Sequence, residues 1–467
     1  MGVSRARMCG RGGPGRDDDP VYVIVVGAGE VGSYVAERLS KEGHDVAVIE
    51  QHPQRLRSVE ERIDVLAVRG SGTSPRVLEM AGIDRADLVV AVTSDDSVNL
   101  LVSLLAKQAD VERTVVRVED SDLRDRQAAS VHKAVGADLV IDPDQETAEE
   151  ILRLLEFPGA TEIASMADGE VVVIGARLAA GGPLVGRTLM EIAQEYEPDW
   201  DFLFGALSRG NTTIIPRGDV RLEANDLVRV MCKKRARHQL AKLLGIAREV
   251  PRRVMLLGGG RTAEMLALRL EAQGADVVVV ERDPVRAREL AERLDRALVL
   301  QGEITDSDLL EEADVATFDA VIALTGEDDA NVLACLFARS AGAGETIAVV
   351  HRLSLLPLLN EAGIDAALSP RTASANGVLR FVRGGVAAVA TFLQGEAEVL
   401  ELVVGENSPA DGALIAELRL PPDVLVGAIV RDGKAQIGRG RSQLRNRDHV
   451  VLFAMPSSVD AARRAFG

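Results

Sequence analysis

Long apolar runs are missing from this chain of 467 residues. A helix that crosses a bilayer needs about 20 uninterrupted apolar residues, whereas the nearest candidate, residues 381–393, contains Arg383 and many small side chains. Residues 1–20 include arginines but no apolar core, which excludes a secretory signal. We expect residues 1–20 to be a disordered tail, or an over-long start upstream of the first strand, on a soluble protein.

Cysteine is scarce, and acidic residues outnumber basic ones. Cys9, Cys232 and Cys335 lie far apart without a Cys-x-x-Cys pair, which excludes a zinc ribbon or a thioredoxin-type site and favours a reducing compartment. The six histidines are scattered and form no His-Glu-x-x-His motif, so no metal site is predicted. The net charge of −18 and the lack of a basic patch argue against a nucleic-acid partner.

The chain contains internal repeats, and these repeats define its domain organisation. At roughly 100–200 residues per domain, the length predicts three or four domains. Residues 21–50 match residues 252–281, and residues 204–231 match residues 426–453. The matched pairs that mark these repeats are Gly27 with Gly258, Gly29 with Gly260, Glu50 with Glu281, Thr93 with Thr325, Asn99 with Asn331, Gly205 with Gly427, Arg209 with Arg431 and Asp226 with Asp448. The order A, B, A′, B′ indicates a duplicated two-domain unit.

The two kinds of unit have different patterns. In the A units, short runs that are apolar on both faces alternate with amphipathic helical stretches, which predicts a parallel, doubly wound, Rossmann-like α/β sheet. The B units hold short β-branched runs broken by glycine-containing turns, with short helices near residues 187–195 and 411–418. We therefore expect each B unit to be a small α+β domain with an antiparallel sheet. The predicted domains span residues 21–145, 160–245, 251–375 and 395–467.

The first A unit carries a candidate dinucleotide cradle. The motif G-x-G-x-x-G follows a predicted strand and opens a predicted helix, and Glu50 ends the next strand. The glycines permit a tight turn, close approach of a pyrophosphate and close helix packing, while the helix N-terminus offers N–H groups to the anion. A carboxylate at Glu50 would accept hydrogen bonds from ribose hydroxyls and repel a 2′-phosphate, which favours NAD over NADP. The candidate residues of the loop are Gly27, Ala28, Gly29, Glu30, Val31 and Gly32.

The second A unit repeats this cradle, with Ala263 in place of the third glycine and Glu281 in place of Glu50. The following residue, Arg282, either stacks on an adenine or faces solvent. The candidate residues of the second loop are Gly258, Gly259, Gly260, Arg261 and Thr262. The sequence thus predicts two nucleotide sites in one chain.

Polar residues follow the fourth predicted strand, where a doubly wound sheet presents its ligand edge. Thr93 and Ser94 are candidates for ligand contact, and Arg117 on the next strand is a candidate phosphate contact or a rim salt bridge. We interpret Asp95 and Asp96 as acids that complement the dipole of the following helix rather than as catalysts. No catalytic motif occurs, and the B units are too small to supply the substrate domain of a dehydrogenase.

The arrangement resembles the cytoplasmic regulators of potassium conductance, the RCK family, which includes the regulatory subunits of Trk-type potassium uptake systems. The resemblance covers nearly the whole chain from about residue 21. It depends on VGAGEVG…VIE, AVTSDDSVN, VGADLVIDP, GGGRTAEMLALRL…VVERD, ALTGEDDANVLA and ALSPRTASANGVL, and on residues 420–453. The resemblance implies nucleotide contacts from residues 27–31, Glu50, Thr93, Ser94 and Arg117, and from residues 258–262, Glu281 and Thr325. Gly326 replaces Ser94, and His351-Arg352 replaces the VVRV strand end, so the second site need not bind the same ligand with the same strength.

The resemblance also implies a function. The chain would be a non-catalytic NAD/NADH sensor, with ATP or ADP as alternative ligand, that gates a potassium-translocating membrane subunit. It would lie in the cytoplasm, on the inner face of the plasma membrane, as a homo-oligomer that is a dimer or a higher ring. Two alternatives remain open: an NAD(P)-dependent oxidoreductase, and a sensor whose B units bind a small ligand such as a cyclic dinucleotide.

Overall fold

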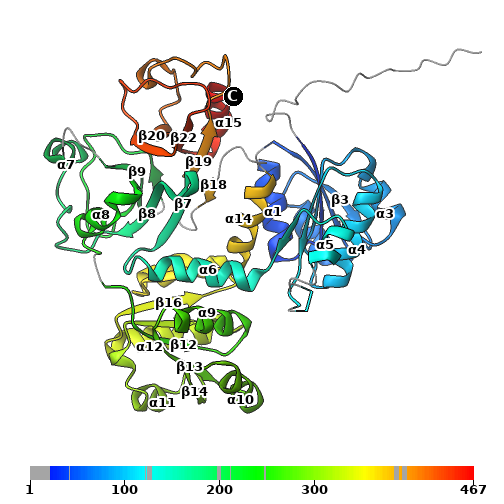
Figure 1. Cartoon of the computed structure of the whole chain (residues 1–467), viewed down its shortest axis with the longest axis vertical. Coiled ribbons are helices and arrows are strands. Elements are labelled where there is room, and N and C mark those ends of the chain that lie inside the picture. Colours follow the sequence, from blue (N-terminus) through cyan, green and yellow to red (C-terminus); the bar gives the residue numbers. More distant parts are fainter. Residues whose placement is uncertain are drawn as a thin grey trace, which may run out of the picture.

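The computed structural model describes residues 21–41, 43–120, 122–123, 129–196, 201–210, 212–246, 249–382, 389–391 and 397–467. The tail expected at residues 1–20 and Cys9 lie outside the described residues. Four sheets follow one another along the chain: parallel, antiparallel, parallel and antiparallel (Figure 1). This order confirms the fold class predicted from the repeats.

The first parallel sheet has the strand order β3-β2-β1-β4-β5-β6. Its strands are β1 (Tyr22–Val26), β2 (Asp45–Glu50), β3 (Leu66–Arg69), β4 (Leu88–Ala91), β5 (Arg113–Arg117) and β6 (Leu139–Ile141). Its helices are α1 (Glu30–Lys41), α2 (Pro53–Glu60), α3 (Pro75–Met80), α4 (Asp96–Gln108) and α5 (Ala129–Ala134). Because successive residues of β1 and β4 are buried on opposite faces of the sheet, both faces need helical cover.

The second parallel sheet repeats this order as β14-β13-β12-β15-β16-β17. Its strands are β12 (Arg253–Leu257), β13 (Asp276–Glu281), β14 (Leu298–Gln301), β15 (Ala320–Ala323), β16 (Glu345–Val349) and β17 (Ala366–Leu368). Its helices are α9 (Arg261–Ala272), α10 (Pro284–Arg293), α11 (Ser307–Glu312), α12 (Asp328–Ala341) and α13 (Leu356–Glu361).

The two antiparallel sheets have the orders β10-β9-β11-β8-β7 and β18-β19-β22-β20-β21. The first comprises β7 (Glu162–Met166), β8 (Val171–Arg177), β9 (Phe202–Arg209), β10 (Thr212–Ile214) and β11 (Leu227–Lys233), with α7 (Leu189–Tyr196) and α8 (Arg237–Leu244). The second comprises β18 (Val389–Thr391), β19 (Glu398–Val403), β20 (Val424–Arg431), β21 (Lys434–Ile437) and β22 (His449–Ala454), with α15 (Val459–Phe466). Single 3₁₀ turns occur at η1 (Ile83–Arg85), η2 (Ala167–Gly169), η3 (Lys234–Ala236), η4 (Val315–Thr317), η5 (Leu353–Leu355), η6 (Ile415–Glu417) and η7 (Pro456–Ser458).

The predicted short helix near residues 187–195 corresponds to α7, but residues 411–418 contain only the turn η6. Gly412 has a φ of 82° just before this turn, and Pro421 and Pro422 follow soon after it. A left-handed residue and two prolines leave room for a single turn rather than a helix.

The two antiparallel sheets pack against each other through a shared apolar layer that includes Val173, Met231, Val399 and Phe453. The repeated glycines lie in this layer. A Cβ at Gly205 would overlap the ring of Phe453, and a Cβ at Gly427 would lie 2.6 Å from the sulfur of Met231. Close packing of the two sheets therefore explains the glycine that the sequence repeats in both copies.

Two long helices exchange places between the halves of the chain. Helix α6 (Pro143–Leu155) follows the first parallel sheet, yet its Ile151 packs in the core of the second, with Leu256 and Ile322. Helix α14 (Pro370–Val382) follows the second sheet, yet its Leu379 packs in the core of the first. In Figure 1, α14 lies beside α1, and α6 extends over α9. The limits that the repeat placed at residues 145 and 375 fall inside these helices and gave no sign of the exchange.

Both described cysteines are free thiols inside the molecule. Burial raises the pKa of the Cys232 and Cys335 thiols to about 12, so neither is a reactive thiolate at neutral pH. These two residues therefore fill the core. Among the described residues, no helix is long and apolar enough to cross a membrane.

The helix exchange predicts that a change in α6 is felt in the second sheet, more than 100 residues further along the chain. Ile151→Ala should lower the free energy of unfolding by about 2–5 kcal/mol, because it leaves a cavity in a closed core. Hydrogen exchange should accelerate in β12 and β15 more than in β1 and β4. Leu333→Ala is the control, since Leu333 is 60% exposed. Faster exchange confined to β1 and β4 would contradict the exchange of helices.

Candidate functional site

The first glycine loop has the geometry that the motif requires. Gly27 has a φ of 104°, which L side chains rarely adopt. A Cβ at Gly32 would overlap the carbonyl oxygen of Gly27, so the third glycine allows α1 to pack closely on β1. A Cβ at Gly29 would meet no described atom within 4 Å. Gly29 therefore faces open space, where a ligand can approach the backbone.

Glu50 ends β2 and lies directly beneath the loop. It is 7% exposed, and its two carboxylate oxygens accept hydrogen bonds of 2.8 Å from the N–H groups of Ala28 and His52. Glu281 does the same in the second copy, at 2.7 Å from the N–H of Gly259 and 2.8 Å from that of Asp283. Each glutamate thus holds its glycine loop in place, a role that the sequence did not reveal, and Glu50 also lines the cavity described below.

Thr93 lies in the loop just after β4 and is fixed by a buried asparagine. Asn99 accepts hydrogen bonds from the backbone N–H of Thr93 at 2.9 Å and from its hydroxyl at 2.7 Å. The amide of Asn99 donates to the carbonyls of Thr93 and Arg117, both at 3.0 Å. Asn331 makes the same four contacts around Thr325 in the second copy. The repeat marked these asparagines, but their clamping role needs the fold.

The two acids after Thr93 are structural. Asp95 caps α4 by accepting from the N–H of Val98 at 3.1 Å, which confirms its interpretation as a helix-end acid. Asp96 accepts from the N–H groups of Glu119 and Asp120, and so joins the start of α4 to the end of β5.

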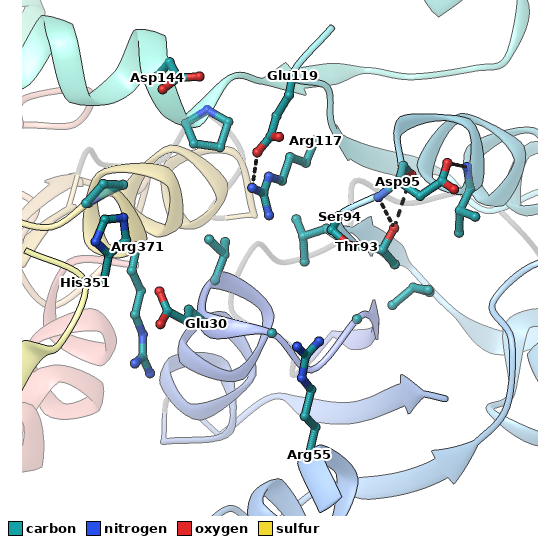
Figure 2. A pocket seen from close by; sticks show the side chains of 18 of the residues that line it. Glu30, Arg55, Thr93, Ser94, Asp95, Arg117, Glu119, Asp144, His351 and Arg371 are labelled. Carbon is teal, nitrogen blue, oxygen red and sulfur yellow. Dashed lines mark hydrogen bonds and ion pairs between the residues drawn. The ribbon is translucent and has the colours of Figure 1, made fainter. Parts of the chain in front are cut away.

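A cavity of about 610 Å³ opens over the first loop and extends to the second half of the chain. Figure 2 shows its walls, to which α1, α2, β5, α6 and α14 all contribute. From the first half it is lined by Gly27, Gly29, Glu30, Val31, Glu50, Thr93, Ser94 and Arg117 among others, and from the second half by Gly260, Arg261, Thr262, Thr325, Gly326, His351 and Arg371 among others. Of the described candidate residues, Ala28, Gly32, Gly258, Gly259 and Glu281 lie outside this lining.

Besides Arg261 of α9, three arginines enter the cavity from different elements: Arg55 from α2, Arg117 from β5 and Arg371 from α14 (Figure 2). Arg117 forms an ion pair with Glu119. The Nε atoms of Arg117 and Arg371 are buried and have no hydrogen-bond partner among the described residues. Buried donors of this kind suit a phosphate ligand. The sequence pointed to Arg117 alone, because Arg55 lies on the next helix and Arg371 comes from the other half.

In the second cradle, residues at the start of α9 contact acidic residues at the start of α6. The hydroxyl of Thr262 donates to Asp144 of α6 at 2.6 Å, and Arg261 lies 3.4 Å from Asp142 and from Asp144. Arg286, the counterpart of Arg55, donates to the carbonyl of Gly259 and pairs with Glu264.

Other positions of the second cradle also differ from the first. Arg282 is 60% exposed and pairs with Glu327 at 2.8 Å, so it faces solvent rather than a base. Val349 takes the place of Arg117, and His351 that of Glu119.

The described residues contain no group of three or more histidine, cysteine or acidic residues arranged to hold a metal ion.

Comparison with known proteins agrees with this architecture. The TrkA-N domain family matches residues 23–143 and 254–370, and the TrkA-C domain family matches residues 173–245 and 399–467. The chain belongs to the TrkA family. The Trk system potassium uptake protein TrkA of Halomonas elongata is 34% identical over 93% of this chain and 95% of its own length. The corresponding protein of Haemophilus influenzae is 32% identical over 92% of this chain and 95% of its own length. A TrkA homolog of Methanosarcina mazei is 34% identical over 95% of this chain and 99% of its own length.

The chain is therefore a regulatory potassium-transport protein of the TrkA type and not an enzyme. Two solved structures share its fold. The crystal structure of the GsuK RCK domain covers 97% of this chain and 96% of its own, with a TM-score of 0.58 and 19% identity. The GsuK channel bound to NAD covers 97% of this chain and 80% of its own, with a TM-score of 0.57 and 19% identity.

Asp328 at the start of α12 predicts a pH dependence of stability. Burial opposes its ionisation, but the N–H groups of His351 and Arg352, at 2.8 and 2.9 Å, and both side chains outweigh burial and hold its pKa below the usual value. A lowered native pKa stabilises the fold above the unfolded pKa of about 3.9, and this contribution is lost as the pH falls through the native value.

Asp328→Asn should therefore be less stable than the unmodified chain at pH 7, and the difference should shrink as the pH falls below about 4. Denaturant unfolding at a series of pH values measures this. Asp329→Asn, at an 83% exposed neighbour, is the control and should differ little at any pH. A gap for Asp328→Asn that stays constant down to the acid limit would show that ionisation is not the cause.

Proposed function

We propose that this chain is the nucleotide-sensing regulatory subunit of a Trk-type potassium uptake system. In this role it docks on the cytoplasmic face of an integral-membrane, potassium-translocating subunit, at the inner face of the plasma membrane. One observation carries the proposal: the cavity over the first glycine loop has walls from both halves of the chain. A nucleotide bound there contacts both halves and so favours one arrangement of the halves over another.

The proposed ligand is NAD or NADH, with ADP or ATP as the alternative. All four contain an adenosine diphosphate, which the loop at residues 27–32 and Glu50 would hold through pyrophosphate and ribose. The N–H groups at the start of α1 and the arginines of the cavity supply donors for the phosphates. The NAD complex of the GsuK channel, which shares this fold, supports the choice of a dinucleotide.

Gating by such a ligand requires unequal binding and no reaction. A ligand shifts an equilibrium between two arrangements only by the difference in its affinity for them, typically about 1–3 kcal/mol per coupled site. The two parallel-sheet domains of each chain would form a ring or split ring within a dimer or a higher oligomer. Movement within this ring would then pull or relax the membrane subunit.

Gly29→Ala tests the site with little cost to the fold. A Cβ there meets no described atom within 4 Å, so stability should stay within about 1 kcal/mol of the unmodified chain, consistent with the cost of a single surface change. The new methyl group projects toward the space where phosphate would lie, so NADH affinity in a calorimetric titration should fall at least tenfold. Gly218→Ala is the control: a Cβ there meets only Met190, at 3.4 Å or more, and Gly218 lies outside the cavity, so NADH affinity should not change.

The same Gly29→Ala chain should lose the nucleotide dependence of potassium flux in vesicles that contain the membrane subunit. Absorbance of the nicotinamide is followed in parallel. Unchanged NADH affinity in Gly29→Ala would contradict the site. Steady consumption of NADH with an added carbonyl compound would contradict the sensor function and favour an oxidoreductase.

A further inference from the structure

The two exchanged helices begin alike but carry opposite charges into the two clefts. Helix α6 starts after β6 with Asp142, Pro143 and Asp144, whereas α14 starts after β17 with Ser369, Pro370 and Arg371. The aligned prolines place Asp144 and Arg371 at equivalent positions. Both residues line the cavity between the halves, but they lie at its two ends: Asp144 bonds to Thr262 beside the second loop, whereas Arg371 lies over Tyr34 of α1 beside the first. We call these two ends the second and the first cleft.

We propose that these exchanged residues decide which cleft of the chain accepts phosphate. Arg371 binds the nucleotide phosphates in the first cleft, and the carboxylate of Asp144 takes the place of phosphate in the second. The inference rests on the proposed nucleotide function and narrows it to one site per chain in this arrangement of the halves.

In the second cleft, the carboxylate contacts the groups that would otherwise receive an anion. Asp144 accepts the hydroxyl proton of Thr262 at 2.6 Å and lies 3.4 Å from Nε of Arg261, both in the first turn of α9. Asp142, which is 4% exposed, lies 3.4 Å from Nη2 of Arg261. The start of a helix attracts negative charge, and here two carboxylates already contact the side chains of its first turn. A nucleotide phosphate would have to displace them and would be repelled by them.

The remaining cation of the second cleft is also held by the protein. Arg286 donates from Nε to the carbonyl of Gly259 at 2.9 Å and from Nη2 to Glu264 at 2.6 Å. In the first half, Ser33 stands where Glu264 stands in the second, and Arg55, the counterpart of Arg286, is exposed on the cavity wall. Arg55 can therefore contact a ligand in the first cleft, whereas Arg286 in the second is already paired with Glu264.

In the first cleft, Arg371 lies over the ring of Tyr34, with its guanidinium carbon 5.4 Å from the ring centroid. Stacking fixes the side chain, yet its buried Nε has no hydrogen-bond partner among the described residues. Figure 2 shows Arg371 on the cavity wall with Glu30, which opens α1. An arginine here presents donors to a phosphate, since charge-assisted hydrogen bonds satisfy a buried donor best.

The charges also explain why each helix occupies the partner half. The first loop carries Glu30 where the second carries Arg261. Asp144 would repel Glu30, and Arg371 would repel Arg261, if each helix folded back on its own half. The charge reversal thus disfavours the unexchanged packing and keeps the two clefts chemically different.

The test is the number of NADH sites on the full-length chain, measured by calorimetric titration at one salt concentration. The unmodified chain should bind one NADH per chain. Arg371→Gln should weaken this site at least tenfold, and Asp144→Asn should add a second site per chain. Arg76→Gln, an exposed residue outside the cavity, is the control for Arg371. Glu149→Gln, which pairs with Arg269 further along α6, is the control for Asp144. Both controls should bind as the unmodified chain does.

The outcomes separate this inference from the proposed function. Two equal sites on the unmodified chain overturn the inference and leave nucleotide sensing intact, whereas no binding at all overturns the proposed function itself. If Asp144→Asn folds and still binds one NADH, Asp144 does not block the second cleft. Asp144→Ser, which keeps a polar partner for Thr262, decides the point if the asparagine variant does not fold. If Arg371→Gln binds as tightly as the unmodified chain, Arg371 does not hold the nucleotide phosphates and the proposal fails.

Discussion

Each parallel sheet must be covered on both faces, and each takes one of its covering helices from the other half of the chain. Strands such as β1 and β12 bury side chains on both sides, so a missing helix would expose a continuous apolar surface. Helices α6 and α14 supply the cover by exchange. The two halves therefore cannot fold apart without uncovering both cores, which makes their relative position part of the native fold.

This exchange also creates the site. Because α6 and α14 begin at the ligand edges of the sheets, it brings their first residues into the clefts of the opposite halves. A ligand in the first cleft would then lie against Arg371 of α14, which packs on the first half, and near Arg261 and Thr262 of the second half. The proposed regulation needs no reactive group. It needs a binding site whose walls come from two bodies, and residues of both halves line this cavity.

Much of this architecture follows from local patterns. The repeats, the double-sided apolar strands and the glycine motif predicted four sheets and the first loop, because spacing along the chain determines such features. Gly27, Gly29 and Gly32 have the backbone roles that the motif implies. Arg209 and Arg431, which the repeat pairs with each other, are partly exposed, and each binds a buried aspartate that the repeat also pairs, Asp226 or Asp448.

The contacts between distant segments could not be predicted in this way. A sequence repeat aligns the two halves but does not indicate which half a helix packs on. The sequence therefore did not predict that Asp144 contacts the second loop and that Arg371 lines the cavity at the first. The bracing of the loop by Glu50 and the clamp of Asn99 on Thr93 also depend on side-chain geometry that spacing does not encode. The repeat predicted two nucleotide sites and marked substitutions in the second, but it did not reveal that the charges at the exchanged helices differ.

The most direct measurement is a structure of the full-length chain determined with bound NADH. We predict ligand density over the first loop, with its pyrophosphate at Gly29 and between Arg117 and Arg371, and a ribose at Glu50. The second loop should keep its contact between Thr262 and Asp144. Density in the second cleft alone, or a chain that stays empty at saturating NADH, would show that the first loop is not the nucleotide site.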